Sequence, residues 1–205
     1  MANTTFSGPV RSLNGFETVS KNATTGAITI TSGSKMAVEA AASAGIEGTA
    51  AVYVTQVERF KSDTDTNVNV VKTTIMIDLT GLRSTAAGDI IGKNGSGVAY
   101  IGQVTTANQG TVFGVTMQCL ETPAGGDPDI NLHSATEGTG VEDTPISDLT
   151  ETLIINSGDL AAGSFVAGGD IAADQFLYLT AGATTDADYT AGRLLITITG
   201  YDVAS

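Results

Sequence analysis

One ten-residue run, Thr111-Val112-Phe113-Gly114-Val115-Thr116-Met117-Gln118-Cys119-Leu120, carries the clearest strand pattern of the chain. From Phe113 to Cys119 the odd positions are mostly large and apolar and the even ones small or polar, which predicts a strand with one buried and one wet face. The β-rich residues 99–106 precede it, and 107–110 supply the Asn and Gly that a tight reversal needs. We therefore predict an antiparallel hairpin over 97–120, whose apolar face requires further strands and an opposing apolar layer.

Similar alternation predicts two more hairpins. The first joins strands at 51–60 and 68–79 through a polar loop. Its buried face is predicted to carry Ile75, Ile77 and Leu79. The second joins strands at 176–180 and 194–199.

The segments between these hairpins are shorter or less regular. Single strands are predicted at 27–31 and 150–156, and Ile90-Ile91 is predicted to plug the core. Residues 36–44 fit either a two-turn helix or an edge strand. The Gly- and Pro-rich residues 121–148 are predicted to form a long loop of the kind that often contacts partners.

Together these elements predict an all-β protein. Strands at this spacing, with long crossing connections and little helix, favour a single-domain, two-sheet β-sandwich of jelly-roll type over a simple meander. The sandwich domain is predicted at 26–205, preceded by an extended N-terminal arm at 1–25. The arm either lies on its own domain or reaches a neighbouring chain.

Composition and charge restrict the partners. The chain of 205 residues has a net charge of −13, with five cations and four anions in residues 1–61 and four cations and eighteen anions in 62–205. Nucleic acid is an unfavourable partner for such a chain, because binding to phosphates needs clustered Lys and Arg. The single Cys forms no intramolecular disulfide, and no apolar run approaches membrane-spanning length. We expect a soluble protein, not bound to a membrane, that folds in a cytoplasm.

The residues offer little catalytic or metal-binding chemistry. Two D-x-D-x-N triplets, at 63–67 and 127–131, lack the Gly and the Glu of a calcium loop, so they are interpreted as turns. His133 is the only histidine, and Cys119 is predicted to pack beside Met117 and Phe113 rather than to act as a thiolate. We expect no enzyme activity, no cofactor and no metal.

Several short stretches, spread over nearly the whole chain, resemble small virion structural proteins of marine tailed bacteriophages, cyanophages in particular. They are 6–12 with 14–16, 89–92, 101–105, 111–114, 123–129 and 189–193. The resemblance implies a particle component without catalysis. From the compact β fold, the acidic bulk and the near-neutral arm we further expect a decoration or cement protein on the capsid exterior, assembled in the host cytoplasm.

Such a protein would bind the major capsid protein where subunits meet, as a dimer or trimer at the symmetry axes of the shell. The alternative is a tail or fibre module that recognises the host, present in far fewer copies. Residues 121–148 are one predicted contact. The other is the apolar and basic set of the arm, namely Phe6, Val10, Arg11, Leu13 and Phe16.

Overall fold

A computed structural model describes residues 17–21, 28–33, 42–43, 45–46, 50–60 and 67–204, with side-chain environments for 42–43, 45–46 and 70–201. The chain separates into two compact units, Met1–Ala37 and Val38–Ser205. In the first unit, β1 (Glu17–Lys21) pairs antiparallel with β2 (Ile28–Gly33), which covers the strand predicted at 27–31. The predicted boundary between arm and domain at residues 25 and 26 stays a prediction.

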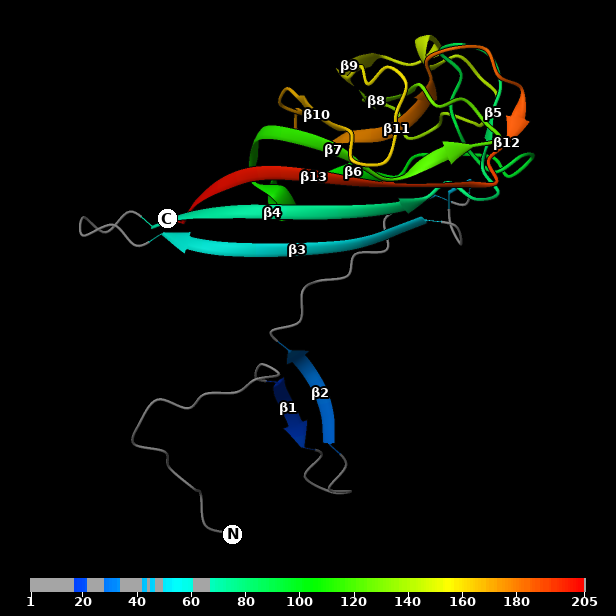
Figure 1. Ribbon diagram of the computed structural model, residues 1–205. Coiled ribbons are helices and arrows are strands. Elements are labelled where there is room, and N and C mark those ends of the chain that lie inside the picture. The colour runs from blue at the N-terminus through cyan, green and yellow to red at the C-terminus, as the bar shows by residue number, and fades with distance from the viewer. Residues whose placement is uncertain are drawn as a thin grey trace, which may run out of the picture. The chain divides into compact units, whose positions relative to one another are not determined.

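The second unit contains two antiparallel sheets, one above the other in Figure 1. The five-stranded sheet has the order β10 (Phe165–Gly168), β7 (Thr111–Ala124), β13 (Ala191–Ala204), β4 (Asn67–Asp78) and β3 (Ala50–Phe60). The four-stranded sheet has the order β6 (Gly102–Val104), β11 (Gln175–Ala181), β8 (Ile130–Ala135) and β9 (Glu151–Ile155). The prediction of an all-β, sandwich-like fold is confirmed.

Three short elements complete the second unit. A two-stranded ladder pairs β5 (Arg83–Ser84) with β12 (Ala187–Asp188). The helices are α1 (Thr106–Gln109) and the 3₁₀ turn η1 (Ile146–Asp148). No helix among the described residues is long and apolar enough to span a membrane.

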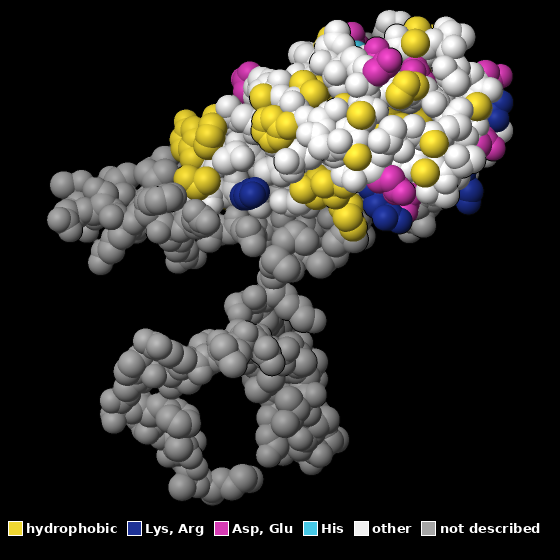
Figure 2. Space-filling view, viewed as in Figure 1, with side chains coloured by type: hydrophobic (Ala, Val, Ile, Leu, Met, Phe, Trp, Pro, Cys, Tyr) yellow, Lys and Arg dark blue, Asp and Glu magenta, His cyan; other side chains and the backbone are white. Residues whose placement is uncertain are grey.

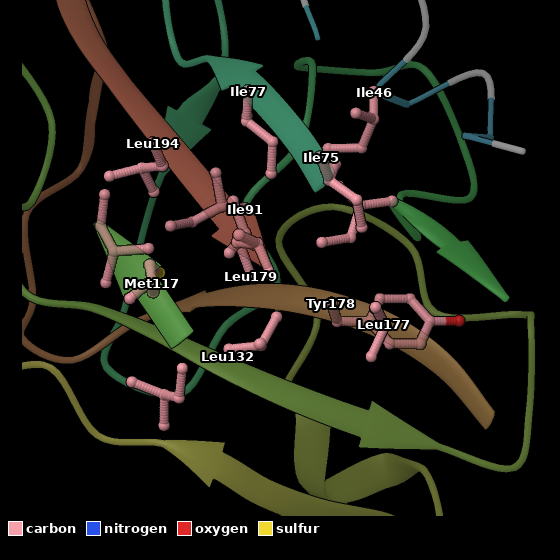
Figure 3. Close-up of a cluster of buried hydrophobic side chains, with 14 of the residues drawn as sticks. Ile46, Ile75, Ile77, Ile91, Met117, Leu132, Leu177, Tyr178, Leu179 and Leu194 are labelled. Atoms are coloured by element: carbon pink, nitrogen blue, oxygen red, sulfur yellow. The ribbon is translucent and has the colours of Figure 1, made fainter. Parts of the chain in front are cut away.

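The core lies between the two sheets. Alternate residues of β4, Ile75 and Ile77, are fully buried, and Met117 of β7 lies in the same cluster (Figure 3). Leu132 and Leu179 enter this cluster from the four-stranded sheet. Full burial of one such side chain contributes about 1.5–3 kcal/mol, so the alternation seen in the sequence is also the main source of stability.

Strand β11 is buried on both faces, unlike an ordinary sandwich strand. Leu177 and Leu179 face one way and Tyr178 and Thr180 the other, and all four are at most 1% exposed. A loop covers the second face, where the Gly140 N–H donates to the Tyr178 hydroxyl at 3.1 Å. Along the edge of the strand, Ile91 donates its N–H to the Leu179 carbonyl at 2.8 Å. The predicted plug of Ile90 and Ile91 is confirmed, since both are buried in the core cluster.

The predicted hairpin over 97–120 is wrong. β6 pairs with β11 in the four-stranded sheet, whereas β7 pairs with β13 and β10 in the other. The predicted turn is α1 instead, where the Thr105 hydroxyl caps the Asn108 N–H and Gly110 ends the helix at φ 66°. Asn and Gly therefore do reverse the chain, but they send it from one layer to the other.

Of the remaining strand predictions, two are confirmed and one is wrong. The hairpin of 51–60 with 68–79 is confirmed as β3 and β4, and β9 confirms the strand at 150–156. The hairpin of 176–180 with 194–199 is wrong, because β11 and β13 lie in different sheets.

The predicted loop at 121–148 is wrong in part. β7 continues to Ala124, and β8 occupies 130–135 between β11 and β9. Most of the 36–44 segment lies outside the described residues.

Candidate interaction surface

The predicted contact residues of the arm, Phe6, Val10, Arg11, Leu13 and Phe16, lie outside the described residues. Within 121–148, β8 is a central strand and Asp127 is buried. Beyond the end of β7 at Ala124, the exposed residues of that segment lie in turns and loops, such as Thr139 and Asp143. A contact surface among the described residues must therefore be sought elsewhere.

The side of the five-stranded sheet that faces away from the core offers such a surface. Strand register places Thr116, Thr197 and Thr74 side by side across β7, β13 and β4. The next row is Phe165, Gln118, Leu195 and Met76. We call these outward positions, together with Lys72, Asp78, Glu121, Arg193, Phe113 and Tyr201, the outer face.

Large apolar side chains are concentrated on this sheet. Among the described side chains, seven large hydrophobic residues are exposed, and five of them lie on β4, β7, β10 and β13: Met76, Phe113, Leu120, Phe165 and Tyr201. Figure 2 shows hydrophobic side chains over these strands, with uncharged atoms and a few charged side chains between them. Exposed apolar groups gathered on one surface usually mark a contact site, because isolated ones would be scattered over the whole protein.

Phe113 is exposed because β7 contains a bulge. Val112 pairs with Gly200 and Gly114 with Thr199, so Phe113 is the extra residue and its side chain turns outward, 56% exposed. Its ring lies 6.2 Å from that of Tyr201, also exposed. The prediction that Phe113 packs beside Cys119 is therefore wrong.

The outer face is electrically balanced. Arg193 lies 3.4 Å from Asp78 and 3.7 Å from Glu121, and Lys72 is the other cation. The pKa of Asp78 is lowered mainly by hydrogen bonds from Thr80, with Arg193 adding to the effect.

Away from this face, the described side chains between residues 70 and 201 include two cations and thirteen anions. The net negative charge of the described unit therefore lies off the outer face.

A polar pocket of about 390 Å³ lies at the β5–β12 ladder. Arg83 bridges Asp186 at 2.6 Å and Asp188 at 3.0 Å. Glu142, 8% exposed, accepts a 3.4 Å hydrogen bond from the Gly95 N–H, and burial raises its pKa. Asp89 accepts hydrogen bonds from the Thr85 hydroxyl and the Ala86 N–H. These carboxylates tie loops together, which is a structural role.

The other polar residues singled out in the sequence have structural surroundings. The Asp127 carboxylate accepts hydrogen bonds from the N–H groups of Asp129 and Ala183, as a turn residue would. His133 lies 2.7 Å from Glu151 in the four-stranded sheet, while Cys119 is buried in the other sheet and burial raises the pKa of its thiol. The described residues include no group of three or more His, Cys, Asp or Glu placed to hold a metal ion.

A comparison of the chain with protein-family models, curated proteins and solved structures finds no match. The surface must therefore be interpreted from its own chemistry. Sequence reasoning missed the outer face because Thr116, Thr197 and Thr74 become neighbours only through the register of three strands. One signal was present: several wet positions of these strands, such as Thr116, Met76 and Leu195, are uncharged, where a solvent-facing strand commonly carries charges.

Proposed function

We propose that this protein is a virion structural protein without catalytic activity, a decoration or cement protein that binds the outer surface of a capsid. The observation that carries the proposal is the separation of charge: a balanced outer face with exposed apolar groups, and thirteen anions against two cations on the rest of the described side chains. The likeness to phage virion structural proteins supports the same role.

In this proposal the outer face packs on the major capsid protein where subunits meet, and the acidic loops face solvent. Burying the outer face adds contact area across each junction. This stabilises the shell, because the protein binds the assembled capsid and not its separated subunits. A dimer or trimer would match the two-fold or three-fold axes of the shell. Neither nucleic acid nor a membrane is a partner in this proposal.

Two finer features belong to the proposal as well. The sandwich is of jelly-roll type, supported by a chain that crosses repeatedly between the layers: β7, β10 and β13 lie in one sheet and β8, β9 and β11 in the other. Residues 1–25 are an arm that reaches a neighbouring subunit through Phe6, Val10, Arg11, Leu13 and Phe16. Deleting residues 1–16 should lower occupancy on particles, and unchanged occupancy would remove the arm from the proposal.

The test is rebinding of purified protein to capsids that lack it. Met76→Glu and Phe165→Glu each place a charge in the balanced face, and both residues are exposed at 42% and 58%, so the fold should be retained. We expect each to weaken binding at least roughly tenfold, since an unpaired charge buried in an interface is costly.

Leu153→Glu is the matched control, because Leu153 is 47% exposed on the four-stranded sheet. It should bind as the wild type does. The reverse pattern, with Leu153→Glu defective and the two outer-face variants normal, would contradict the proposal.

A further inference from the structure

A groove of about 320 Å³ opens beside the four-stranded sheet. Ser134 of β8 and Thr152 of β9 are register partners and line it side by side. Gln175, at the start of β11, lines it too, and Asp170, in the segment between β10 and β11, completes it.

This groove continues the space between the two sheets. Ser134 pairs with Leu177 across β8 and β11, and the next pair along, Leu132 with Leu179, is buried in the core. Paired residues of adjacent strands lie on one face of a sheet. The groove is therefore on the side of the four-stranded sheet that faces the core. The leucines that fill the interlayer space give way to hydroxyl and amide groups in the groove.

Ser134 lacks a hydrogen-bond partner in this groove. The residue is only 2% exposed, but its hydroxyl oxygen is not fully enclosed, and no hydrogen bond joins it to another described group. The side chains of Thr152 and Gln175 likewise form no hydrogen bond within the described part of the chain. These three side chains are therefore open to hydrogen bonds with a ligand that enters the groove.

The lining selects the chemistry of that ligand. Hydroxyl and amide groups both donate and accept, the one carboxylate, Asp170, accepts, and the lining contains no cation. This set suits a neutral molecule with many hydroxyls and disfavours phosphates and other anions. Ile154 and Ala172 supply apolar surface for C–H groups. The volume is at the lower end of the range for small-molecule sites.

We propose that this groove binds a neutral pyranose unit of a carbohydrate, with Ser134, Thr152, Gln175 and Asp170 as its hydrogen-bonding groups. The site lies on a different sheet from the outer face and does not depend on the proposed function.

The test is a titration of the full 205-residue chain, labelled with ¹⁵N, with four probes: the methyl pyranosides of glucose, galactose and mannose, and N-acetylglucosamine. We expect at least one probe to shift the amide signals of Ser134, Thr152 and Gln175 with a Kd on the order of 1 mM. Sodium phosphate should leave them unchanged. If all four sugars leave these signals unshifted, or if they shift only signals elsewhere, the proposal is wrong.

Variants separate a binding role from a structural one. Ser134→Ala and Thr152→Val should each weaken sugar binding roughly tenfold, the effect of losing one hydrogen bond to a well-placed hydroxyl. Ser134→Ala should also leave the melting temperature unchanged, because the Ser134 hydroxyl forms no hydrogen bond within the described part of the fold. Thr111→Val, at an exposed position of β7, is the control and should bind normally. A Ser134→Ala protein that melts lower and keeps its sugar affinity would overturn the assignment.

Discussion

The negative charge of Asp129 destabilises the folded protein. One of its carboxylate oxygens is buried with no hydrogen-bond partner among the described residues, and it lies against Gly182, where a Cβ atom would collide with the carboxylate. Burial raises the pKa of Asp129, and the nearby Asp127 and Asp159 raise it further. The ionised form is therefore less favourable in the folded chain than in the unfolded one.

Asp129→Asn should stabilise the protein at pH 7. The gain in unfolding free energy should be about 1 kcal/mol or less, since solvent screens a partly exposed group. A raised folded-state pKa means that wild type regains stability as the pH falls toward 3.8, the ordinary pKa of an Asp side chain, so the gain should shrink between pH 7 and that value. Urea unfolding at several pH values measures it, with the exposed Asp148→Asn as control. A variant less stable than wild type at pH 7 would contradict this account.

Tyr178 ties the loop at 137–140 to the four-stranded sheet. Its hydroxyl accepts the Gly140 N–H at 3.1 Å and donates to the Glu137 carbonyl at 2.8 Å. Tyr178→Phe should lower the unfolding free energy by about 1–3 kcal/mol, because the Gly140 N–H is left buried without a partner. Tyr201→Phe, on the outer face, should change it by less than about 0.5 kcal/mol. Equal effects in urea unfolding would show that the Tyr178 hydroxyl bonds to water instead.

Among the elements, β7 is an inner strand of the five-stranded sheet. It pairs with β13 over most of its length and with β10 on its other edge. One face of the strand, with Val115, Met117 and Cys119, is buried, and the other belongs to the outer face. The strand therefore supplies core and contact surface at once, and substitutions on its two faces should act differently.

Met117 and Met76 provide a matched test of these two faces. Met117 is 0% exposed and Met76 is 42% exposed, on neighbouring rows of the same sheet. Met117→Ala should lower the unfolding free energy by about 2–5 kcal/mol through lost burial and a cavity. Met76→Ala should change it by less than about 0.5 kcal/mol. Thermal and urea unfolding measure both, and a Met76→Ala variant as unstable as Met117→Ala would show that this face is part of the folded core.

The sequence could predict strands better than their partners. Alternation marked β4, β7 and the buried residues Ile75 and Ile77, because side-chain period is a local property. It could not show that β7 pairs with β13 rather than with β6, since that choice depends on packing between residues about 80 apart in the chain. The bulge at Phe113 was equally invisible, and so was the outer face, which exists only once the register is known.

For the whole molecule, the distribution of charge predicts which surface docks. With a net charge of −13, two copies or a copy and an acidic neighbour repel each other least through a balanced face. The outer face meets that condition, with Arg193 placed between Asp78 and Glu121.

Binding through this face should depend weakly on salt. Raising ionic strength from about 0.05 M to about 0.5 M screens charges beyond a few ångströms but does not weaken apolar contact. We expect capsid occupancy, measured by co-sedimentation, to change by less than about threefold over this range. A loss of occupancy by orders of magnitude would show that the acidic loops, rather than the outer face, bind the shell.

An icosahedral reconstruction of particles that contain this protein tests the central claim most directly. We predict density for the β-sandwich on the outer surface of the shell at subunit junctions, in numbers on the order of hundreds. In that density β10, β7, β13 and β4 should present their outer face to the capsid protein, with Asp143 and the other acidic loop residues toward solvent. Density confined to the tail in a dozen copies or fewer, or a sandwich whose outer face is turned to solvent, would contradict the account.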